Sequence, residues 1–586
     1  MTEKLIIANC SGFYGDRISA AREMVQGGPI DVLTGDYLAE LTMAILFRNK
    51  MKNPKAGYAG TFLKQMEEVM GECLQKKIRV VTNAGGLNPR GMAEELEKIA
   101  EKLGLKPKIA FIEGDDLTRR LAELQKEGEA FAHMDKGTPL KDARANTVTA
   151  NAYLGGWGIS EALGRGADIV VTGRVTDAAV VVGPAAWRFN WKRDDWDRLA
   201  GAVAAGHIIE CGGQATGGNY SFVDEVPTYR NLGFPLCEMH ADGSFVISKH
   251  PGTGGLVSVG TVTAQLLYEI QGHRYYNPDV IARFDTLKVS QEGPDRVRVE
   301  GAKGEPPTPT TKVCINNLGP FRNQMTVLLT GLDIEKKAKI VEEMFFDAVG
   351  GREQFQRVEV NLIRTDHENP ASNEQAFAYL KINVIDPNPK KVGKAFSSRV
   401  VELALCSIPG FTMTSPPGDE IPSVIYWPAL VSSDKIRQKV YVGGEELNVE
   451  AVQAPQTPPA VKVPEVRIPP VPKGDTVKKP LGRAFATRSG DKGGNANVGI
   501  WSKTPEGYAF LREFLTTERL KEILPDARPF EVERYEFPNL NALNFYIRGI
   551  LGDGVASSTR SDPQAKTLGE YLRARVVEMP GSIVVK

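Results

Sequence analysis

The chain has 586 residues, 42% of them hydrophobic and 25% charged, and its formal net charge is zero. This composition is ordinary for a folded globular protein, and the length exceeds what one hydrophobic core usually holds, so we expect about two to four domains. A neutral chain lacks the positive charge typical of proteins that bind nucleic acid or anionic membranes, and no apolar run of about 18 residues predicts a membrane span.

The six cysteines and six histidines give no sign of a disulfide framework or a zinc site, because neither CxxC nor HxxxH spacing occurs. Scattered cysteines predict free thiols in a reducing cytoplasm. The N-terminal residues lack the pattern of a secretory signal peptide, which favours the same location. We predict no metal site, with carboxylate-bound Mg²⁺ as an open alternative.

The first part of the chain alternates between apolar runs and helical patterns. The apolar, β-branched runs predict buried strands at 4–9, 31–34, 79–82, 108–112 and 168–171. Helical patterns follow most of these strands. This alternation is typical of an α/β domain with a mostly parallel sheet, which we place at residues 1–220.

The loops that follow these strands are rich in acidic and amide side chains. They contain Asp16, Asp36, Asn83, Asp115, Asp116 and Asp177. Ligands of such sheets bind beyond the carboxyl ends of the strands. Any single aspartate has an alternative interpretation as a helix N-cap. Their recurrence at one end of one sheet favours a functional site.

Two short stretches provide the candidate chemistry, GRVTDA at 173–178 and ECGGQATGG at 210–218. Asp177 and Glu210 could act as general acid and base if burial separates their pKa values. Arg174 could bind a carboxylate or phosphate, and the glycine backbone could stabilise an oxyanion. Two alternatives stay open. Arg174 and Asp177 could simply pair with each other, and Cys211 could be either a nucleophile or an unreactive thiol.

The remainder of the chain divides into three further parts. Residues 221–453 predict an α+β region, in which a glycine-rich turn contains His250, interpreted as a turn residue. Residues 454–478 are rich in proline and predict an extended linker. Residues 479–586 predict a small ferredoxin-like α+β domain. Its segment RSGDKGGN at 488–495 could bind an anion such as a CoA phosphate, or could be a hairpin turn or a docking surface.

These motifs together resemble the acyclic terpene utilisation A (AtuA) family over about residues 3–450. The resemblance rests on GDYLAE at 35–40, NAGGLNP at 83–89, GRVTDA, ECGGQ, YEI at 268–270 and YNPDV at 276–280. The final domain is similar to the family's ferredoxin-fold domain, through RSGDKGGN, NLNALNF at 539–545 and GDGV at 552–555. The resemblance implies breakdown of branched terpenoid acids as CoA thioesters, alongside a biotin-dependent carboxylase. It provides no catalytic residues.

The expected fold is therefore α/β, with a mostly parallel, Rossmann-like N-terminal sheet, an α+β middle region and a ferredoxin-like C-terminal domain. The expected function is a cytoplasmic acyl-CoA hydratase or lyase without a cofactor, assembled as a homo-oligomer. Candidate catalytic residues are Glu210, Asp177, Cys211 and Asp36. Candidate substrate-binding residues are Arg174, Asn83, Gly85, Gly86, Gly212, Gly213, Gln214, Gly217, Gly218, Ser489, Asp491, Lys492 and Asn495.

Two other functions are compatible with the same residues. One is a non-catalytic protein that binds acyl-CoA or acts as a scaffold for a carboxylase, and the other is a thioester hydrolase. The hydratase or lyase requires Asp177 and Glu210 to face one cavity, within about 10 Å of each other. The hydrolase requires an exposed Cys211 beside a base.

Overall fold

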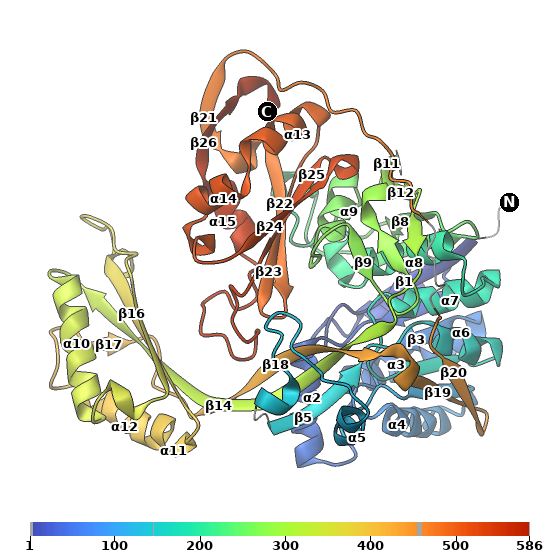
Figure 1. The fold of residues 1–586 in the computed structure, drawn as a ribbon, viewed down its shortest axis with the longest axis horizontal. Coiled ribbons are helices and arrows are strands. Elements are labelled where there is room, and N and C mark those ends of the chain that lie inside the picture. Colours follow the sequence, from blue (N-terminus) through green and yellow to red (C-terminus); the bar gives the residue numbers. More distant parts are fainter. Residues whose placement is uncertain (1–3, 144–145, 454–459, 585–586) are drawn as a thin grey trace. The chain divides into compact units, whose positions relative to one another are not determined.

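The computed structural model describes residues 4–143, 146–453 and 460–584. The chain divides into two compact units (Figure 1). Unit 1 contains the described residues up to Asn316 and from Tyr426 onward, and unit 2 is Asn317–Ile425. The predicted mixture of helices and strands is confirmed, whereas the predicted division of the chain at 220, 453 and 478 stays a prediction.

The largest sheet of unit 1 is mixed, with eleven strands. Five neighbouring strands at its centre are parallel, in the order β1 (Lys4–Asn9), β2 (Val32–Gly35), β3 (Arg79–Thr82), β6 (Ile169–Thr172) and β4 (Ile109–Glu113). Antiparallel strands extend both sides: β7 (Pro235–His240), β8 (Phe245–Lys249), β12 (Arg296–Glu300) and β11 (Lys288–Gly293) beyond β1, and β19 (Arg437–Val442) and β20 (Glu445–Glu450) beyond β4. The predicted parallel sheet is thus confirmed only at the centre, because apolar runs indicate burial and not the direction of the partner strand.

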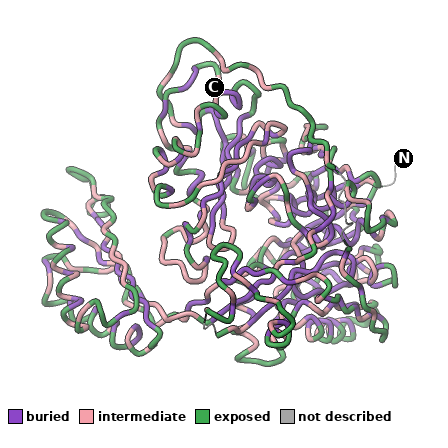
Figure 2. Tube along the Cα trace, viewed as in Figure 1, coloured by how far each residue is buried: buried purple, intermediate pink, exposed green. Residues whose placement is uncertain are grey.

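Helices cover both faces of the parallel centre, as neighbouring residues of its strands show. Ala8 and Leu33 pack with one set of helices, whereas Ile7 and Val32 pack with the other. Successive side chains of a strand point to opposite faces of the sheet, so these strands are buried on both faces. The first set is α1 (Ala20–Gln26), α3 (Gly60–Lys76) and α4 (Pro89–Lys102), and the second is α6 (Trp157–Gly164), α7 (Ala179–Phe189) and α8 (Trp196–Ile209). Figure 2 shows the resulting buried interior.

Helix α8 is buried all round, since residues 199–209 are all buried. Its glycines allow this close packing. A Cβ on Gly201 would lie 2.0 Å from the carbonyl oxygen of Gly243, and one on Gly206 would lie 2.6 Å from the Cα of Ala178. The second approach brings the C-terminal end of α8 beside the loop that follows β6.

The other elements of unit 1 surround this core. They are α2 (Glu40–Lys52), α5 (Leu121–Lys126), β5 (Asn146–Ala152), α9 (Val259–Leu266), β9 (Arg274–Tyr276), β10 (Ile281–Arg283) and β13 (Lys303–Glu305). Two long strands, β14 (Thr310–Thr330) and β18 (Ile421–Ser432), pair with each other and run from unit 1 into unit 2.

Unit 2 is a small sheet covered by helices. Its strands are the later part of β14 with β15 (Arg357–Ile363), β16 (Phe377–Asp386) and β17 (Thr412–Met413), and its helices are α10 (Ile334–Ala348), α11 (Pro389–Val392) and α12 (Lys394–Glu402). Phe345 and Phe396 from two of these helices pack against Leu380 and Val327 of the sheet. Unit 2 is thus one part of the predicted α+β region at 221–453, whereas β7, β8, β11, β12, β19 and β20 of that region belong to the large sheet of unit 1.

The C-terminal part of unit 1 has its own four-stranded antiparallel sheet. Its order is β22 (Phe485–Lys492), β23 (Asn495–Ser502), β25 (Ala542–Ile547) and β24 (Val532–Phe537). It is completed by α13 (Pro505–Phe514), α14 (Thr517–Ile523), α15 (Leu568–Ala574) and the pair β21 (Thr476–Pro480) and β26 (Val576–Pro580). The segment 488–495 contains the hairpin turn that the sequence offered as one alternative, because β22 and β23 pair with each other and turn at Gly493 and Gly494.

The two faces of this sheet have different roles. Val498 and Ile500 of β23 pack with the domain's own helices, whereas Asn497 and Gly499 face the rest of unit 1. A Cβ on Gly499 would lie 2.7 Å from the Cβ of Leu267, so only glycine permits this contact. The sheet therefore docks through a polar, glycine-containing face.

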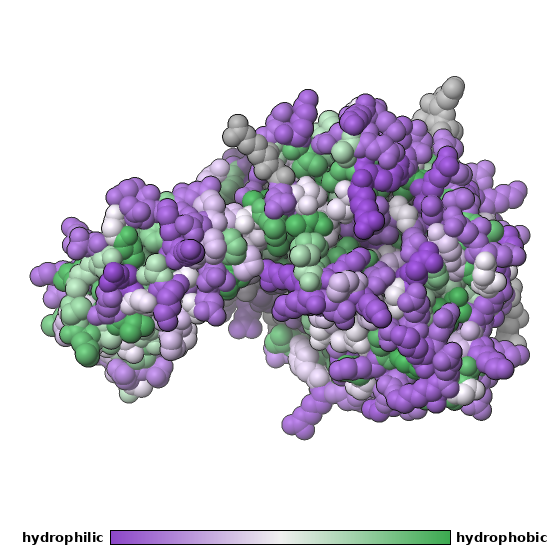
Figure 3. Space-filling view, turned by 90° about the horizontal axis from the view of Figure 1, so that it is seen from below, coloured by the Kyte–Doolittle hydropathy of each residue, from purple (hydrophilic) through white to green (hydrophobic). Residues whose placement is uncertain are grey.

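Part of the predicted linker, 454–459, lies outside the described residues. Residues 460–475 form no helix or strand, and β21 begins at Thr476. On the face of unit 1 seen in Figure 3, hydrophilic residues predominate and hydrophobic residues occur in small groups. In the part of the chain that the structure describes, no helix is long and apolar enough to cross a membrane.

Candidate functional site

Three carboxylates meet at the carboxyl ends of the parallel strands. Asp36 follows β2 directly, Asp177 lies in the loop after β6, and Glu210 follows the last residue of α8. One oxygen from each lies within 4.8 Å of the others. Asp177 and Glu210 are thus well inside the distance of about 10 Å that acid–base chemistry requires.

Asn83, which follows β3, orients Asp36. Its side-chain nitrogen donates to Asp36 Oδ1 at 2.5 Å, and its oxygen accepts the Tyr37 N–H at 2.8 Å. The Leu38 N–H donates to the same Oδ1 at 3.2 Å. Burial raises the pKa of Asp36, and the nearby Asp177 and Glu210 raise it further.

Glu210 is 7% exposed, and its two carboxylate oxygens differ in their contacts. Its Oε1 lies 3.3 Å from His207 Nδ1, whereas Oε2 is buried without a hydrogen-bond partner among the described residues. Burial and the charge of Asp177 raise the pKa of Glu210. Burial lowers the pKa of His207 to about 4, so the imidazole is neutral and the contact is not an ion pair.

Arg174 is buried beside the cluster. Its Nη1 donates to Asp177 Oδ1 at 2.8 Å and to the carbonyl oxygens of Leu38 and Val175 at 3.3 and 3.2 Å. The guanidinium carbon lies 4.3 Å from the centre of the Tyr153 ring. The pairing of Arg174 with Asp177 that the sequence left open therefore exists, and both side chains also line the cavity described next.

The cluster opens into a cavity of about 520 Å³, within the range of about 300 to 1,000 Å³ typical of small-molecule sites. Its wall includes seven carboxylates and five cationic side chains, and hence has a formal charge of −2. The carboxylates are Asp16, Asp36, Glu40, Asp177, Glu210, Glu269 and Asp491, and the cations are Arg17, Arg174, Lys312, Lys492 and Lys566. Phe13, Leu38, Leu232 and Phe234 add apolar surface.

The C-terminal domain completes this wall. Lys566 Nζ contacts Glu269 Oε1 at 3.0 Å and Asp491 Oδ1 at 3.2 Å, and it also bonds to the Tyr268 hydroxyl. Burial and the charge of Glu269 raise the pKa of Asp491 to about 7. Burial opposes ionisation of Glu269, but Lys566 and Lys492 outweigh it and lower its pKa.

Two asparagines of the C-terminal sheet hold the segment that contains Tyr268 and Glu269. Asn497 Nδ2 donates to the Leu267 carbonyl at 2.6 Å, and its oxygen accepts the Glu269 N–H at 2.9 Å. Asn544 Nδ2 donates to the Ile270 and Gln271 carbonyls at 3.2 and 2.7 Å. The fold therefore uses buried amides on β23 and β25 to position a cavity residue from the middle of the chain.

The predicted site residues separate into two groups. Asp36, Asp177, Glu210, Cys211, Arg174, Gly213, Gln214, Gly218, Asp491 and Lys492 line the cavity, and Asn83 lies directly behind Asp36. The others do not line it: Gly85, Gly86, Gly212, Gly217, Ser489 and Asn495.

Three residues of the second group have structural contacts. A Cβ on Gly85 would lie 2.5 Å from the Thr172 carbonyl oxygen, and Gly212 has a φ of +58° and packs on Phe234. Ser489 accepts the Gly569 N–H at 3.0 Å. His250 bonds to the Met24 carbonyl at 3.0 Å and does not line the cavity.

Cys211 is partly exposed at the cavity. Burial raises the pKa of its thiol well above 9.0, and Glu210 and Glu269 raise it further. Arg488, on the neighbouring hairpin, bonds to Gln214 and stacks on Tyr268 at 4.2 Å. The hairpin thus contacts the ECGGQ segment, in agreement with the docking alternative for 488–495.

Sequence reasoning missed several cavity residues. Glu40 lies in the GDYLAE motif and Glu269 in the YEI motif. Their place in motifs of the family resemblance was the only sequence feature that could have marked them as site residues. Tyr153, whose hydroxyl donates to Glu40 at 2.9 Å, and Lys312, 3.5 Å from the same oxygen, gave no local signal. Lys566 gave none either, because its partners are about 75 and 300 residues away in the sequence.

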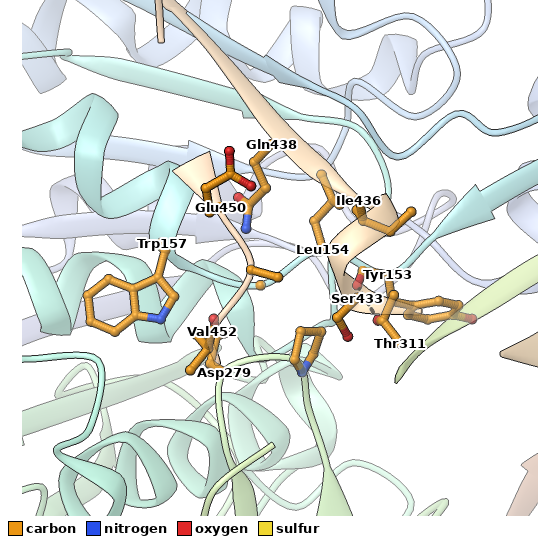
Figure 4. Close-up of a pocket in the computed structure, with 13 residues that line it drawn as sticks. Tyr153, Leu154, Trp157, Asp279, Thr311, Ser433, Ile436, Gln438, Glu450 and Val452 are labelled. Carbon is orange, nitrogen blue, oxygen red and sulfur yellow. Dashed lines mark hydrogen bonds between the residues drawn. The ribbon is translucent and has the colours of Figure 1, made fainter. Parts of the chain in front are cut away.

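A second buried carboxylate lies apart from this cavity, at a much smaller one of about 30 Å³ (Figure 4). Asp279 Oδ2 accepts the Gly156 N–H at 2.8 Å, and Gln438 Oε1 accepts the Gly158 N–H at 3.0 Å. These two bonds satisfy backbone groups at the start of α6, which lacks a side-chain cap of its own. Asp279 therefore has a structural role.

The comparisons with protein families match this architecture. Residues 5–442 match the family described as acyclic terpene utilisation family protein AtuA, and residues 480–578 match the AtuA ferredoxin-like domain. The predicted ferredoxin-like C-terminal domain is thereby confirmed. Comparison with curated proteins and with solved structures gave no match. Because the first match spans well over half of the sequence and includes all three clustered carboxylates, the chain belongs to the acyclic terpene utilisation (AtuA) family.

Proposed function

We propose that this protein is an acyl-CoA-processing enzyme of branched-chain or terpenoid acid breakdown, which adds or removes water or cleaves a carbon–carbon bond. The observation that supports it is the meeting of Asp36, Asp177 and Glu210 in one cavity. Hydration, dehydration and retro-aldol cleavage need a base, an acid and stabilisation of an enolate or thioester oxygen, without a redox cofactor.

In this proposal Glu210 is the acid and Asp177 is the base. Glu210 is suited to hold a proton, because burial and Asp177 raise its pKa. The Asp177 side chain is 28% exposed and reaches the cavity, whereas that of Glu210 is 6% exposed. Asp36, which also lines the cavity, has a pKa that burial, Asp177 and Glu210 raise, so it can hold a second proton beside them.

The remaining lining provides binding groups of the required kinds. Arg174 and Lys492 can bind a carboxylate or phosphate. The backbone at Gly213 and Gly218 can approach a thioester oxygen. Leu232 and Phe234 offer an apolar surface for a branched acyl chain.

The alternatives have less support. A thioester hydrolase acting through Cys211 requires a lowered thiol pKa, whereas burial raises it. A scaffold for a carboxylase gives no reason to bury three carboxylates together. A cytoplasmic location, which the six free cysteines favour, and a homo-oligomeric assembly complete the proposal.

The test is a screen of the purified full-length protein against branched and unsaturated acyl-CoA thioesters, by thermal shift and mass spectrometry. A true ligand at a hundredfold excess over Kd stabilises the folded state by about 2.7 kcal/mol. A gain or loss of one water, or cleavage, supports the proposal and identifies the reaction class. Binding without turnover favours the scaffold, and the absence of any shift contradicts an acyl-CoA function.

A further inference from the structure

The same carboxylate cluster has the composition of a cation site. The geometry points to one binding site for a hard divalent cation of the Mg²⁺, Mn²⁺ or Ca²⁺ class, with Asp36, Asp177 and Glu210 as ligands. This inference goes beyond the proposed function, because cation binding is measured without substrate and does not depend on the reaction class.

The unpartnered oxygen of Glu210 is the observation that separates this cluster from an ordinary acidic group. Glu210 is 93% buried, and its Oε2 has no hydrogen-bond partner among the described residues. Buried polar atoms without a partner are rare in folded proteins, and one reason for them is an ion or water that binds there. Glu210 lines the cavity, so a cation that enters the cavity meets this carboxylate.

The ligand oxygens of the other two carboxylates also remain available. Both hydrogen bonds that Asp36 accepts fall on its Oδ1, and Arg174 donates to Oδ1 of Asp177. Each side chain thus has a second oxygen to offer. The donors are all carboxylate oxygens, which are the ligands that Mg²⁺, Mn²⁺ and Ca²⁺ prefer.

The local charge matches a divalent cation. A cation that binds here displaces the proton that Glu210 holds in its absence, and the three ionised carboxylates with the guanidinium of Arg174 then have a formal charge of −2. Arg174 cannot swing into the cluster to neutralise more of it without breaking its bonds to the Leu38 and Val175 carbonyls and its stacking on Tyr153. One divalent cation would bring this group to neutrality.

The spacing of the oxygens also agrees. Oxygens on opposite sides of a cation lie about 4 Å apart for Mg²⁺ and about 5 Å apart for Ca²⁺, given metal–oxygen distances of about 2.1 and 2.4 Å. The ligand atoms of the cluster lie within 4.8 Å of one another. The remaining coordination positions would face the cavity, where water or a substrate oxygen can occupy them.

The experiment measures Mn²⁺ binding by the full-length protein after treatment with EDTA, by calorimetry and by electron paramagnetic resonance, with Mg²⁺ and Ca²⁺ as competitors. We expect one site per chain, displaced by at least one competitor. Asp36→Asn, Asp177→Asn and Glu210→Gln should each weaken Mn²⁺ binding at least about tenfold. Asp279→Asn, which removes the buried carboxylate at the start of α6, should leave the affinity unchanged.

Two results would overturn the cation site: no binding by the wild type up to millimolar Mn²⁺, or binding that all three cluster variants retain. Thermal melting of each variant shows that it is folded, and Asp177→Asn, at the most exposed of the three positions, is the least disruptive to folding. Loss of the cation site would leave the acid–base proposal intact, because acyl-CoA turnover is measured separately in EDTA. Cation binding without turnover would contradict only the proposed function.

Discussion

Two of the regions of unit 1 that bury carboxylates do so in different ways. At the start of α6, Asp279 accepts the Gly156 N–H at 2.8 Å and closes a cavity of about 30 Å³ (Figure 4). At the carboxyl ends of β2 and β6, three carboxylates meet at a cavity of about 520 Å³, and Glu210 leaves one oxygen unpartnered. Burial alone does not separate the two regions, because it raises the pKa of Asp279 and of Glu210 alike.

What separates them is the number of like charges and the space in front of them. A single buried carboxylate that accepts a backbone N–H replaces a missing helix cap and stabilises the fold. Three carboxylates that face one another repel, so the fold is less stable for having them together. Such an arrangement is typical of a functional site and not of a structural one.

The largest effect that this comparison predicts is on turnover. Asp177→Asn should lower kcat at least about a hundredfold, because it removes the proposed base. Asp279→Asn, its matched control, should leave kcat close to the wild-type value. Steady-state kinetics with the acyl-CoA found in the screen measures kcat of both variants. An equal loss of kcat in the two variants would mean that the two regions do not differ in their role in turnover.

The second prediction concerns the dependence of stability on pH. Burial raises the pKa of Asp279 from 3.8 to about 6, although the Gly156 N–H opposes the shift. The folded protein therefore holds this proton more tightly than the unfolded chain. The resulting stability is complete below about pH 4 and is lost as the pH rises through about 6, by about 3 kcal/mol in total.

Asp279→Asn keeps an oxygen for the Gly156 N–H and cannot ionise. It should therefore flatten the decline in the free energy of unfolding between about pH 4 and pH 8, by up to about 3 kcal/mol. Urea denaturation across this range measures the slope. If the variant declines as steeply as the wild type, Asp279 is not protonated in the folded state at low pH as described here.

The third prediction tests how tightly the structural region is packed. A Cβ on Gly155 would lie 2.1 Å from Asp279 Oδ1, so Gly155→Ala should destabilise the fold by about 1 to 3 kcal/mol. Gly60→Ala, at the start of α3, is the control, because nothing lies within 4 Å of the added Cβ. Chemical denaturation should find the control unchanged or slightly more stable. An equal loss in both would mean that the contact with Asp279 is not the cause.

The smallest effect is expected at Cys211. Burial and Glu210 raise the pKa of its thiol, so it is protonated at neutral pH and a poor nucleophile. Cys211→Ser should change kcat by no more than a few-fold. Iodoacetamide should modify the exposed Cys406 before Cys211, as peptide mass spectrometry can show. Rapid modification of Cys211 with loss of turnover would instead favour the thioester hydrolase.

The sequence predicted the centre of the site because that part is local. Asp36 and Asp177 each follow a buried apolar strand, and parallel strands bring their carboxyl ends to one edge. Glu210 was found because it adjoins a glycine-rich segment. The close packing of Gly206 on Ala178, which joins these positions, became visible only in the structure.

The parts that sequence reasoning missed depend on long-range partners. Strands β7 and β19 join the parallel centre antiparallel to it, and no local pattern specifies a partner from another part of the chain. Lys312 and Lys566 reach the cavity from distant segments. For residues 488–495 the sequence left an anion site, a hairpin turn and a docking surface open, and only the structure shows that 488–492 pair with β23 and contact Gln214 in another part of unit 1. Gly85 and Gly212 were assigned to a ligand, whereas their small size permits tight turns.

One variant shows most directly whether the clustered carboxylates serve a ligand and not the fold. Glu210→Gln should be assayed for acyl-CoA turnover and for melting temperature in the same preparation. Turnover should fall at least about a hundredfold while the melting temperature stays the same or rises, because glutamine cannot donate a proton and is uncharged, like the protonated Glu210 that it replaces. A variant that melts lower and keeps its turnover would show that Glu210 stabilises the fold and takes no part in the reaction.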